Sequence, residues 1–275
     1  MKFSRNILIL GGDERQKIVY KELKNKGFNC SYFYDNFDLS KIKYYEIIAL
    51  PVPLSKDGEY IFSDNSDFKV AIRDLISYAT KRQLLIFGSA SSRTKEMLDD
   101  RGLNYYDLFF EESFAINNAY YTAQGTLLEI LKNTKEYIVG KRVLILGFGR
   151  VGKAVANILS KNGMNVFVAA RNEKQLSECE GLGYGRISYD ELKSTLFLFD
   201  LIVSTVPFNV LSKQEIFLLN DNAIFIELAS APYSAKREWF SECNKRYILA
   251  SGLPGKYLGI ESGKKIAEMI ECYIS

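Results

Sequence analysis

A glycine-rich loop between an apolar strand and a helix is the feature that most constrains how this chain can fold. The segment VLILGFGRVGKAVANIL begins at Val143, and Gly147, Gly149 and Gly152 have the spacing G-x-G-x-x-G. The first glycine of this motif permits a tight turn, the second lets the backbone approach a pyrophosphate, and the third lets helix and strand pack closely. The anion would lie at the helix N-terminus, where N–H groups and the helix dipole favour negative charge. The motif predicts dinucleotide binding, and the alternative is a glycine turn that binds no ligand.

The strand that follows the glycine loop predicts which dinucleotide is bound. It reads NVFVAARNEK over residues 165–174 and ends in Ala170, Arg171 and Asn172. In NAD enzymes a carboxylate near this strand end accepts hydrogen bonds from the ribose 2′-hydroxyl, and it would repel a 2′-phosphate. A guanidinium instead pairs with the phosphate. Arg171, with Asn172 as a second donor, therefore favours NADP over NAD, and the alternative is a solvated loop arginine without selectivity.

Apolar runs typical of strands alternate with segments of helical period along the chain, which predicts an α/β fold with parallel sheets. Strands are expected at 7–10, 28–34, 47–50, 84–87, 142–146, 165–169, 200–205, 223–228 and 247–251. Helices are expected at 14–26, 68–79, 122–135, 153–162 and 262–273.

We expect two domains: an N-terminal flavodoxin-like or Rossmann-like α/β domain and a C-terminal NAD(P)-binding Rossmann domain. The expected boundaries are residues 1–121 for the substrate-side domain, 122–136 for a linking helix, 137–261 for the Rossmann domain, and 262–275 for a helix that packs back at the domain junction.

Composition excludes several classes of function. The chain of 275 residues has no histidine, which removes histidine acid–base catalysis, Ser-His-Asp triads and histidine-ligated zinc. The net charge of +3 is spread over scattered lysines, so nucleic-acid binding is not expected. The four cysteines have no CxxC spacing, and neither a disulfide nor a metal site is expected. No apolar run is long enough for a membrane span, and the start MKFSRNILILGG is typical of a first strand, so we expect a cytoplasmic protein.

Residues at the carboxyl ends of the predicted second-domain strands form the expected cofactor site, because ligands of open α/β sheets bind at that edge. The candidates are Gly147, Gly149, Arg150, Val151, Gly152, Arg171, Asn172, Thr205, Val206, Pro207, Leu228, Ala229 and Gly252.

The first predicted strand also ends in glycines, in the segment ILILGGDERQ. Gly11 and Gly12 lack the third glycine of the dinucleotide motif, and Asp13 and Arg15 follow them. One interpretation is that Arg15 faces the cleft and holds a substrate carboxylate. The alternative is a helix cap followed by a solvated arginine.

Nearly the whole chain resembles the A subunit of dipicolinate synthase. The resemblance is carried by GGDERQ at 11–16, LPVP at 50–53, IFG at 86–88, NNAYYTAQGT at 117–126, VLILGFGRVGKAVA at 143–156, VAARN at 168–172, STVP at 204–207, ELAS at 227–230 and GLPG at 252–255. It implies an NADP-dependent oxidoreductase that oxidises a dihydrodipicolinate-type heterocycle, a small dicarboxylate, to dipicolinate by hydride transfer. It also implies that the partner is a flavoprotein-like B subunit, and that the location is the mother-cell cytoplasm of a sporulating bacterium. Whether copies of the chain assemble with one another is left open.

The resemblance also suggests roles for the remaining candidates. Arg15 would anchor a carboxylate, Thr122 and Asn118 would lie at the floor of the cleft, and Tyr257 or Asp13 would relay a proton.

The chain departs from the family pattern at several positions, and two of these departures remove cations. The departures are Gln124 in place of Glu, Ala231 in place of Arg, Tyr233 and Ser234 in place of glycines, and Gly259 and Ile260 in place of Pro and Lys. Arg15, Lys256 and Arg237 are the cations that could substitute. Two alternatives therefore stay open: an NADP-binding sensor or partner subunit without catalysis, and an NADP reductase for another small carboxylic acid.

Overall fold

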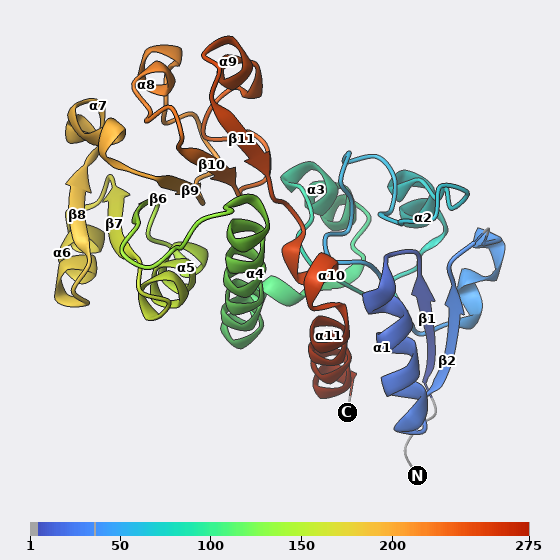
Figure 1. The fold of residues 1–275 in the computed structure, drawn as a ribbon. Coiled ribbons are helices and arrows are strands. Elements are labelled where there is room, and N and C mark those ends of the chain that lie inside the picture. The colour runs from blue at the N-terminus through green and yellow to red at the C-terminus, as the bar shows by residue number, and fades with distance from the viewer. Residues whose placement is uncertain (1–4, 36, 275) are drawn as a thin grey trace. The chain divides into compact units, whose positions relative to one another are not determined.

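In the computed structural model, which describes residues 5–35 and 37–274, the chain forms two compact α/β units. One unit comprises Met1–Ala115 together with Tyr257–Ser275, and the other comprises Ile116–Lys256. Each unit contains one sheet whose strands all run parallel, and helices cover the strands (Figure 1). The expected α/β class with two parallel sheets is confirmed.

The sheet of the first unit has the strand order β2-β1-β3-β4-β5, which is the order of flavodoxin-like folds. Its strands are β1 (Asn6–Leu10), β2 (Asn29–Phe33), β3 (Ile47–Ala49), β4 (Leu84–Phe87) and β5 (Asn104–Asp107). Its helices are α1 (Glu14–Asn25), α2 (Ile72–Tyr78), α3 (Ser92–Asp100) and α11 (Gly259–Ile274), with the 3-10 turns η1 (Leu39–Tyr44) and η2 (Leu108–Phe110).

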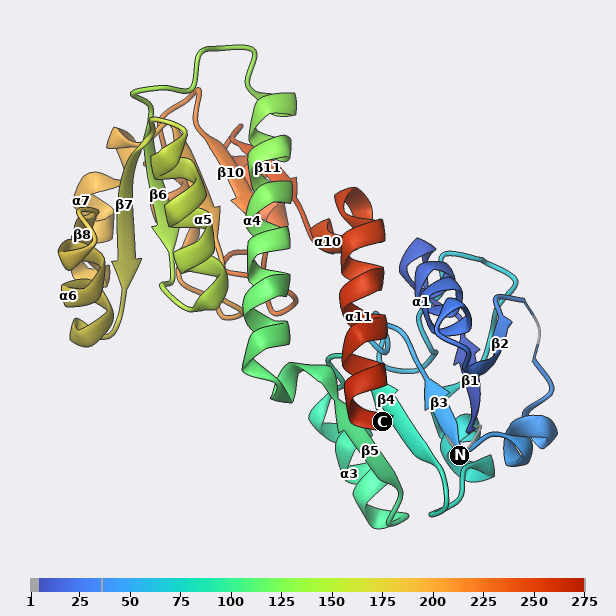
Figure 2. The ribbon, with the colours of Figure 1, turned by 90° about the horizontal axis from the view of Figure 1, so that it is seen from below.

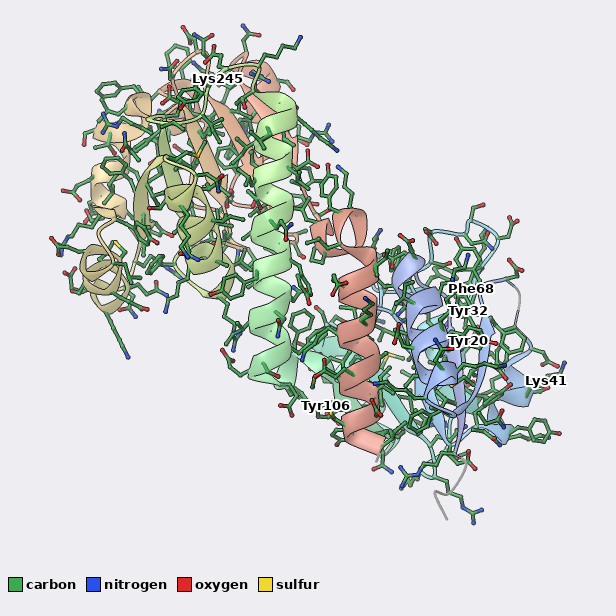
Figure 3. The ribbon with its side chains drawn as sticks, turned by 60° about the horizontal axis from the view of Figure 1, so that its bottom comes forward. Tyr20, Tyr32, Lys41, Phe68, Tyr106 and Lys245 are labelled. Atoms are coloured by element: carbon green, nitrogen blue, oxygen red, sulfur yellow. The ribbon has the colours of Figure 1, made fainter. Side chains whose placement is uncertain are left out.

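The C-terminal helix α11 belongs to the first unit, where it lies beside α1 (Figures 1 and 2). A side chain at Gly263 would bring a Cβ to 2.7 Å from the Cβ of Ile18 and to 2.8 Å from the carbonyl oxygen of Arg15. The glycine therefore permits the two helices to approach closely. Near the other end of α11, the ring of Tyr273 stacks on that of Tyr106 of β5 with 3.9 Å between ring centroids. Figure 3 labels Tyr106.

The sheet of the second unit has the order β11-β10-β9-β6-β7-β8. Its strands are β6 (Arg142–Leu146), β7 (Asn165–Ala170), β8 (Gly185–Ser188), β9 (Leu201–Ser204), β10 (Ile224–Glu227) and β11 (Arg246–Leu249). The helices are α5 (Arg150–Lys161), α6 (Glu173–Gly181), α7 (Leu192–Thr195), α8 (Lys213–Phe217), α9 (Arg237–Glu242) and α10 (Leu253–Tyr257), with the 3-10 turns η3 (Tyr189–Glu191) and η4 (Leu196–Leu198). The helix α4 (Glu112–Asn133) lies mainly in this unit.

The chain reverses its direction of winding at β6, the first strand of this unit. The next strand along the chain, β7, pairs with one side of β6, and β9 pairs with the other side. Val143 and Leu144 in the middle of β6 are completely buried, as expected for a parallel strand covered on both faces. The crevice for a ligand in such sheets lies outside the carboxyl ends of the two strands at this switch point.

Some elements differ from the sequence expectation. The helix expected at 122–135 begins ten residues earlier, at Glu112, and the one expected at 68–79 begins at Ile72. The helices α3 and α6 and the strands β5 and β8 were not expected from the sequence. These two strands have the sequences NYYD and GRIS, which are short and too polar for an apolar run to stand out.

None of the helices in the described ranges is both long enough and apolar enough to cross a membrane.

Candidate functional site

The glycine turn between β6 and α5 is closed on one side and open on the other. Gly147 has a φ of +92°, and a Cβ there would lie 2.6 Å from Cγ1 of Val206 and 2.8 Å from Oγ1 of Thr205. A Cβ on Gly152 would come closer than 3.0 Å to the carbonyl oxygen of Gly147. A Cβ on Gly149 would meet none of the described atoms within 4 Å. Packing therefore requires the first and third glycines, and the second faces open space, where a pyrophosphate can approach the backbone.

The N-terminus of α5 is arranged for an anion. Gly149 is the N-cap residue, and it has no side chain with which to cap the first turn. Arg150 is exposed and Val151 is half-buried in that turn. Helix N-termini with uncapped N–H groups bind phosphates through those groups and through the helix dipole.

Thr205 connects the ends of β6 and β9 at the switch point. Its backbone N–H and its hydroxyl both donate to the carbonyl of Leu146, at 3.0 Å and 2.9 Å. Val206 is buried against the glycine turn, and Pro207 is exposed beside it. The loop after β9 thereby forms the second wall of the predicted dinucleotide site.

Arg171 lies exposed just after β7 with its guanidinium over an aromatic ring. Its Cζ is 4.1 Å from the ring centroid of Phe208, which follows β9. Within the described ranges no carboxylate pairs with Arg171, and no hydrogen bond of its side chain is seen. Burial raises the pKa of the nearby Tyr189 hydroxyl, and the positive charge of Arg171 opposes that rise. The stacked face of the guanidinium leaves its N–H edges for an anion.

Asn172 has a local role as well. It is the N-cap of α6, and its Oδ1 accepts the backbone N–H of Lys174 at 2.8 Å. Its amide NH2 group makes none of these bonds and can donate to an anionic ligand.

The end of β10 carries a buried carboxylate. Glu227 is completely buried, and it accepts the backbone N–H of Ala229 at 3.2 Å and that of Ser234 at 2.9 Å, together with the Ser234 hydroxyl. Burial raises the pKa of Glu227, and the hydrogen bonds from Ser234 and Ser204 oppose that rise. Leu228, half-buried, donates its N–H to the carbonyl of Ser204 at 2.9 Å.

Gly252 comes after the last strand of the sheet. It is exposed with a φ of +68°, and a Cβ there would meet no described atom within 4 Å. It therefore leaves room in front of the loop that leads into α10.

In the first unit, Asp13 and Arg15 pair with each other at the end of β1. Nε and Nη2 of Arg15 donate to the two carboxylate oxygens of Asp13 at 2.8 Å and 2.7 Å. Arg15 is 5 % exposed, and Asp13 also caps α1 by accepting the backbone N–H of Arg15. Nη1 of Arg15 has no partner among the described residues, so that nitrogen is the one left for a carboxylate ligand.

The other candidates for substrate binding are partly engaged. The buried Thr122 donates its hydroxyl to the carbonyl of Asn118 at 2.8 Å on α4, where Asn118 is half-buried. Tyr257, at the end of α10, is half-buried. Lys256 is one of the cations that could substitute for those missing at Ala231 and Ile260. It forms an ion pair with the buried Glu129.

The structure thus gathers the cofactor candidates at one edge of the second sheet, whereas Asp13 and Arg15 lie at the end of β1 in the first unit. The sequence alone indicated no role for Phe208 or Ser234. An aromatic residue directly after STVP was the available signal for Phe208. Glu227 inside an otherwise apolar run was the signal for a buried polar network that includes Ser234.

No cluster of potential metal ligands occurs among the described residues.

Comparisons with known proteins give separate matches for two parts of the chain. Residues 6–109 match the family model of the N-terminal domain of the dipicolinate synthase A subunit. Residues 117–248 match that of the D-isomer specific 2-hydroxyacid dehydrogenase NAD binding domain, which indicates a nicotinamide dinucleotide cofactor. The chain is 23% identical to the dipicolinate synthase A subunit of Bacillus subtilis strain 168, over 96% of this chain and 94% of that protein.

Two solved structures share the fold. The crystal structure of the dipicolinate synthase A subunit from Bacillus halodurans superposes with a TM-score of 0.86 at 20% identity, covering 100% of this chain and 99% of that one. The corresponding crystal structure from Bacillus subtilis gives a TM-score of 0.85 at 22% identity, covering 100% and 97%.

Proposed function

We propose that this chain, an NAD(P)-dependent oxidoreductase that is similar over nearly its whole length to the A subunits of dipicolinate synthase, uses NADP to oxidise a dihydrodipicolinate-type heterocycle to dipicolinate. The observation that carries the cofactor proposal is Arg171, whose guanidinium stacks on Phe208 at the strand end where NAD enzymes place a carboxylate. A 2′-phosphate there gains charge-assisted hydrogen bonds from the free guanidinium edge.

The proposed reaction suits a chain without histidine. The substrate loses a hydride and a proton and becomes an aromatic pyridine, and the bound NADP⁺ supplies the hydride acceptor. Aromatisation makes this direction favourable, so the protein has mainly to bind two carboxylates and orient one ring carbon. A strong general base is therefore a smaller requirement than in many dehydrogenases.

For the substrate we propose that Arg15 anchors one carboxylate through Nη1. Asp13 accepts hydrogen bonds from Nε and Nη2 of the same guanidinium, and these two bonds fix the orientation of the Arg15 side chain. Asn118 and the lone pairs of the Thr122 hydroxyl offer further polar contacts on α4. Tyr257 or Asp13 relays the released proton to solvent in this proposal.

We propose that the chain works with a partner of the B type, in the cytoplasm of a sporulating cell. The support is the similarity to proteins named as the A subunit of dipicolinate synthase, since such a name implies a second kind of subunit.

The test is a reaction with and without a B-type partner. The purified chain is given NADP⁺ and freshly generated dihydrodipicolinate, and absorbance of the reduced nicotinamide is followed. NADPH and dipicolinate should appear in equal amounts. Arg15→Lys and Arg15→Ala should raise the KM for the heterocycle and leave the dissociation constant of NADP unchanged, because Arg15 contributes nothing to the cofactor site in this proposal.

The alternative is a sensor or partner subunit that binds NADP without catalysis. It is kept because the chain departs from the pattern of the family that it resembles at Ala231, Gly259 and Ile260. In addition, Lys256 is already paired with Glu129. Tight NADP binding with no turnover, with and without the B-type partner, would select this alternative. Turnover of a different small carboxylic acid would select an NADP reductase.

A further inference from the structure

The segment after β10 and the segment after β9 meet at one residue, Ser234. Its carbonyl oxygen accepts the backbone N–H groups of Val210 and Leu211 at 2.8 Å and 3.1 Å. Its own N–H and hydroxyl donate to a single oxygen of Glu227. Ser234 therefore ties both segments to the end of β10.

The carboxylate of Glu227 is the fixed point of this arrangement. Glu227 is completely buried, and its other oxygen accepts the N–H of Ala229. Pairing with both neighbouring strands also fixes the position of β10, because Glu227 is paired with Ser204 of β9 on one side and with Leu249 of β11 on the other. A buried carboxylate is costly unless donors surround it, so these bonds hold the loop in one conformation.

The segment held by Ser234 carries the support of the cofactor arginine. Residues 205–211 include Thr205 and Val206 against the glycine turn, and Phe208 under the guanidinium of Arg171. A continuous path of contacts therefore runs from Glu227 through Ser234 and the chain at 210–211 to Phe208.

From this path we infer that Glu227 and Ser234 form a clamp that positions Phe208 and Arg171 for the 2′-phosphate of NADP. Glu227 and Ser234 are then positioning residues for cofactor specificity. The inference rests on the proposed use of NADP. In this inference the clamp acts through the backbone of the loop after β9 and needs no direct contact with the dinucleotide.

The test measures dissociation constants of NADPH and NADH by the change in their fluorescence on binding. Ser234→Ala removes the hydroxyl donor, and Glu227→Gln keeps the shape but replaces one acceptor oxygen with a donor. Each variant should weaken NADPH binding by about 2- to 30-fold, the range seen for residues that act on a site through others. NADH binding should change less, so the preference for NADPH over NADH should fall.

A double-mutant cycle distinguishes a clamp from two independent residues. If Glu227 and Ser234 act as one unit, the variant carrying both substitutions should bind NADPH about as weakly as the worse single variant. The matched control is Ser212→Ala, because the N–H and hydroxyl of Ser212 also donate to one oxygen of a glutamate, Glu215, but in a solvent-exposed capping box. This control should lose a similar pair of hydrogen bonds and keep the wild-type ratio of the NADPH and NADH dissociation constants.

Three outcomes overturn the inference. Variants that lose thermal stability and yet keep the wild-type ratio of constants show a purely structural role. Additive effects in the cycle show that the two residues do not act together. A wild-type chain that binds neither dinucleotide removes the proposed function as well, and this result is distinct from the first two. If Glu227→Gln does not fold, the ratio of the NADPH and NADH dissociation constants measured for Ser234→Ala decides whether the inference holds.

Discussion

Replacing Arg171 by aspartate tests the cofactor proposal at the residue on which it depends. The variant Arg171→Asp removes the guanidinium that faces the proposed 2′-phosphate and introduces the carboxylate that NAD enzymes use. Hydrogen bonds to charged groups contribute about 1.5–3 kcal/mol. Their loss corresponds to about 10- to 150-fold weaker binding, since each 1.4 kcal/mol is about tenfold. Repulsion between carboxylate and phosphate adds about 1 kcal/mol per pair of unit charges at 4 Å in water.

The structure indicates that this substitution leaves the fold intact. Arg171 is exposed and makes no ion pair with the described residues, and its guanidinium lies over the ring of Phe208 with 4.1 Å between Cζ and the ring centroid. A cation–π contact at an exposed site contributes about 0.5–1 kcal/mol. A small loss of thermal stability is therefore expected, and it is far smaller than the change in NADP affinity.

The assay is a titration with NADPH and with NADH at fixed pH, carried out at low salt and at about 0.15 M salt, where charges more than about 8 Å apart are largely screened. The preference for NADPH should be reversed or abolished in Arg171→Asp and reduced in Arg171→Ala. The control Lys193→Ala removes one exposed positive charge from α7 of the same unit and should leave the preference unchanged. An unchanged preference in Arg171→Asp, with the protein folded, would refute the assignment of this strand end to the 2′-phosphate.

Three further predictions follow from the packing of each unit. Gly152→Ala should abolish dinucleotide binding with little loss of secondary structure in far-UV circular dichroism, because the added Cβ meets the carbonyl oxygen of Gly147 and displaces the turn; unchanged binding would contradict the tight packing of this turn. Gly263→Leu should lower the free energy of unfolding by roughly 1–3 kcal/mol in denaturant titration, because it forces α11 away from α1; a stability equal to wild type would be inconsistent with that contact. Cys30 should resist a thiol reagent at pH 8 while Cys272 reacts, because burial raises the pKa of the Cys30 thiol to about 11 and Cys272 is exposed. Mass spectrometry of the labelled peptides identifies the modified thiol. Equal labelling of the two cysteines would contradict the burial of Cys30.

The sequence alone determined the features that depend on neighbours along the chain. The strand, glycine turn and helix around Gly147 lie within one continuous segment, and the spacing of three glycines is enough to predict the turn. Alternating strand and helix patterns likewise predicted two parallel sheets, since period and apolar content are local properties. The identity of Arg171 at a strand end was readable in the same way.

Tertiary structure decided which of these residues are free to act. Arg15 was expected to hold a carboxylate or lie solvated, but folding buries it and pairs two of its nitrogens with Asp13. Phe208 supports Arg171 although the two are far apart in the chain, because β7 and β9 flank β6 and end at one edge of the sheet. Such pairings depend on strand order and on the direction of side chains, which no local pattern records. The sequence therefore determined the class of cofactor, and the fold determined the partners that orient the residues proposed to bind it.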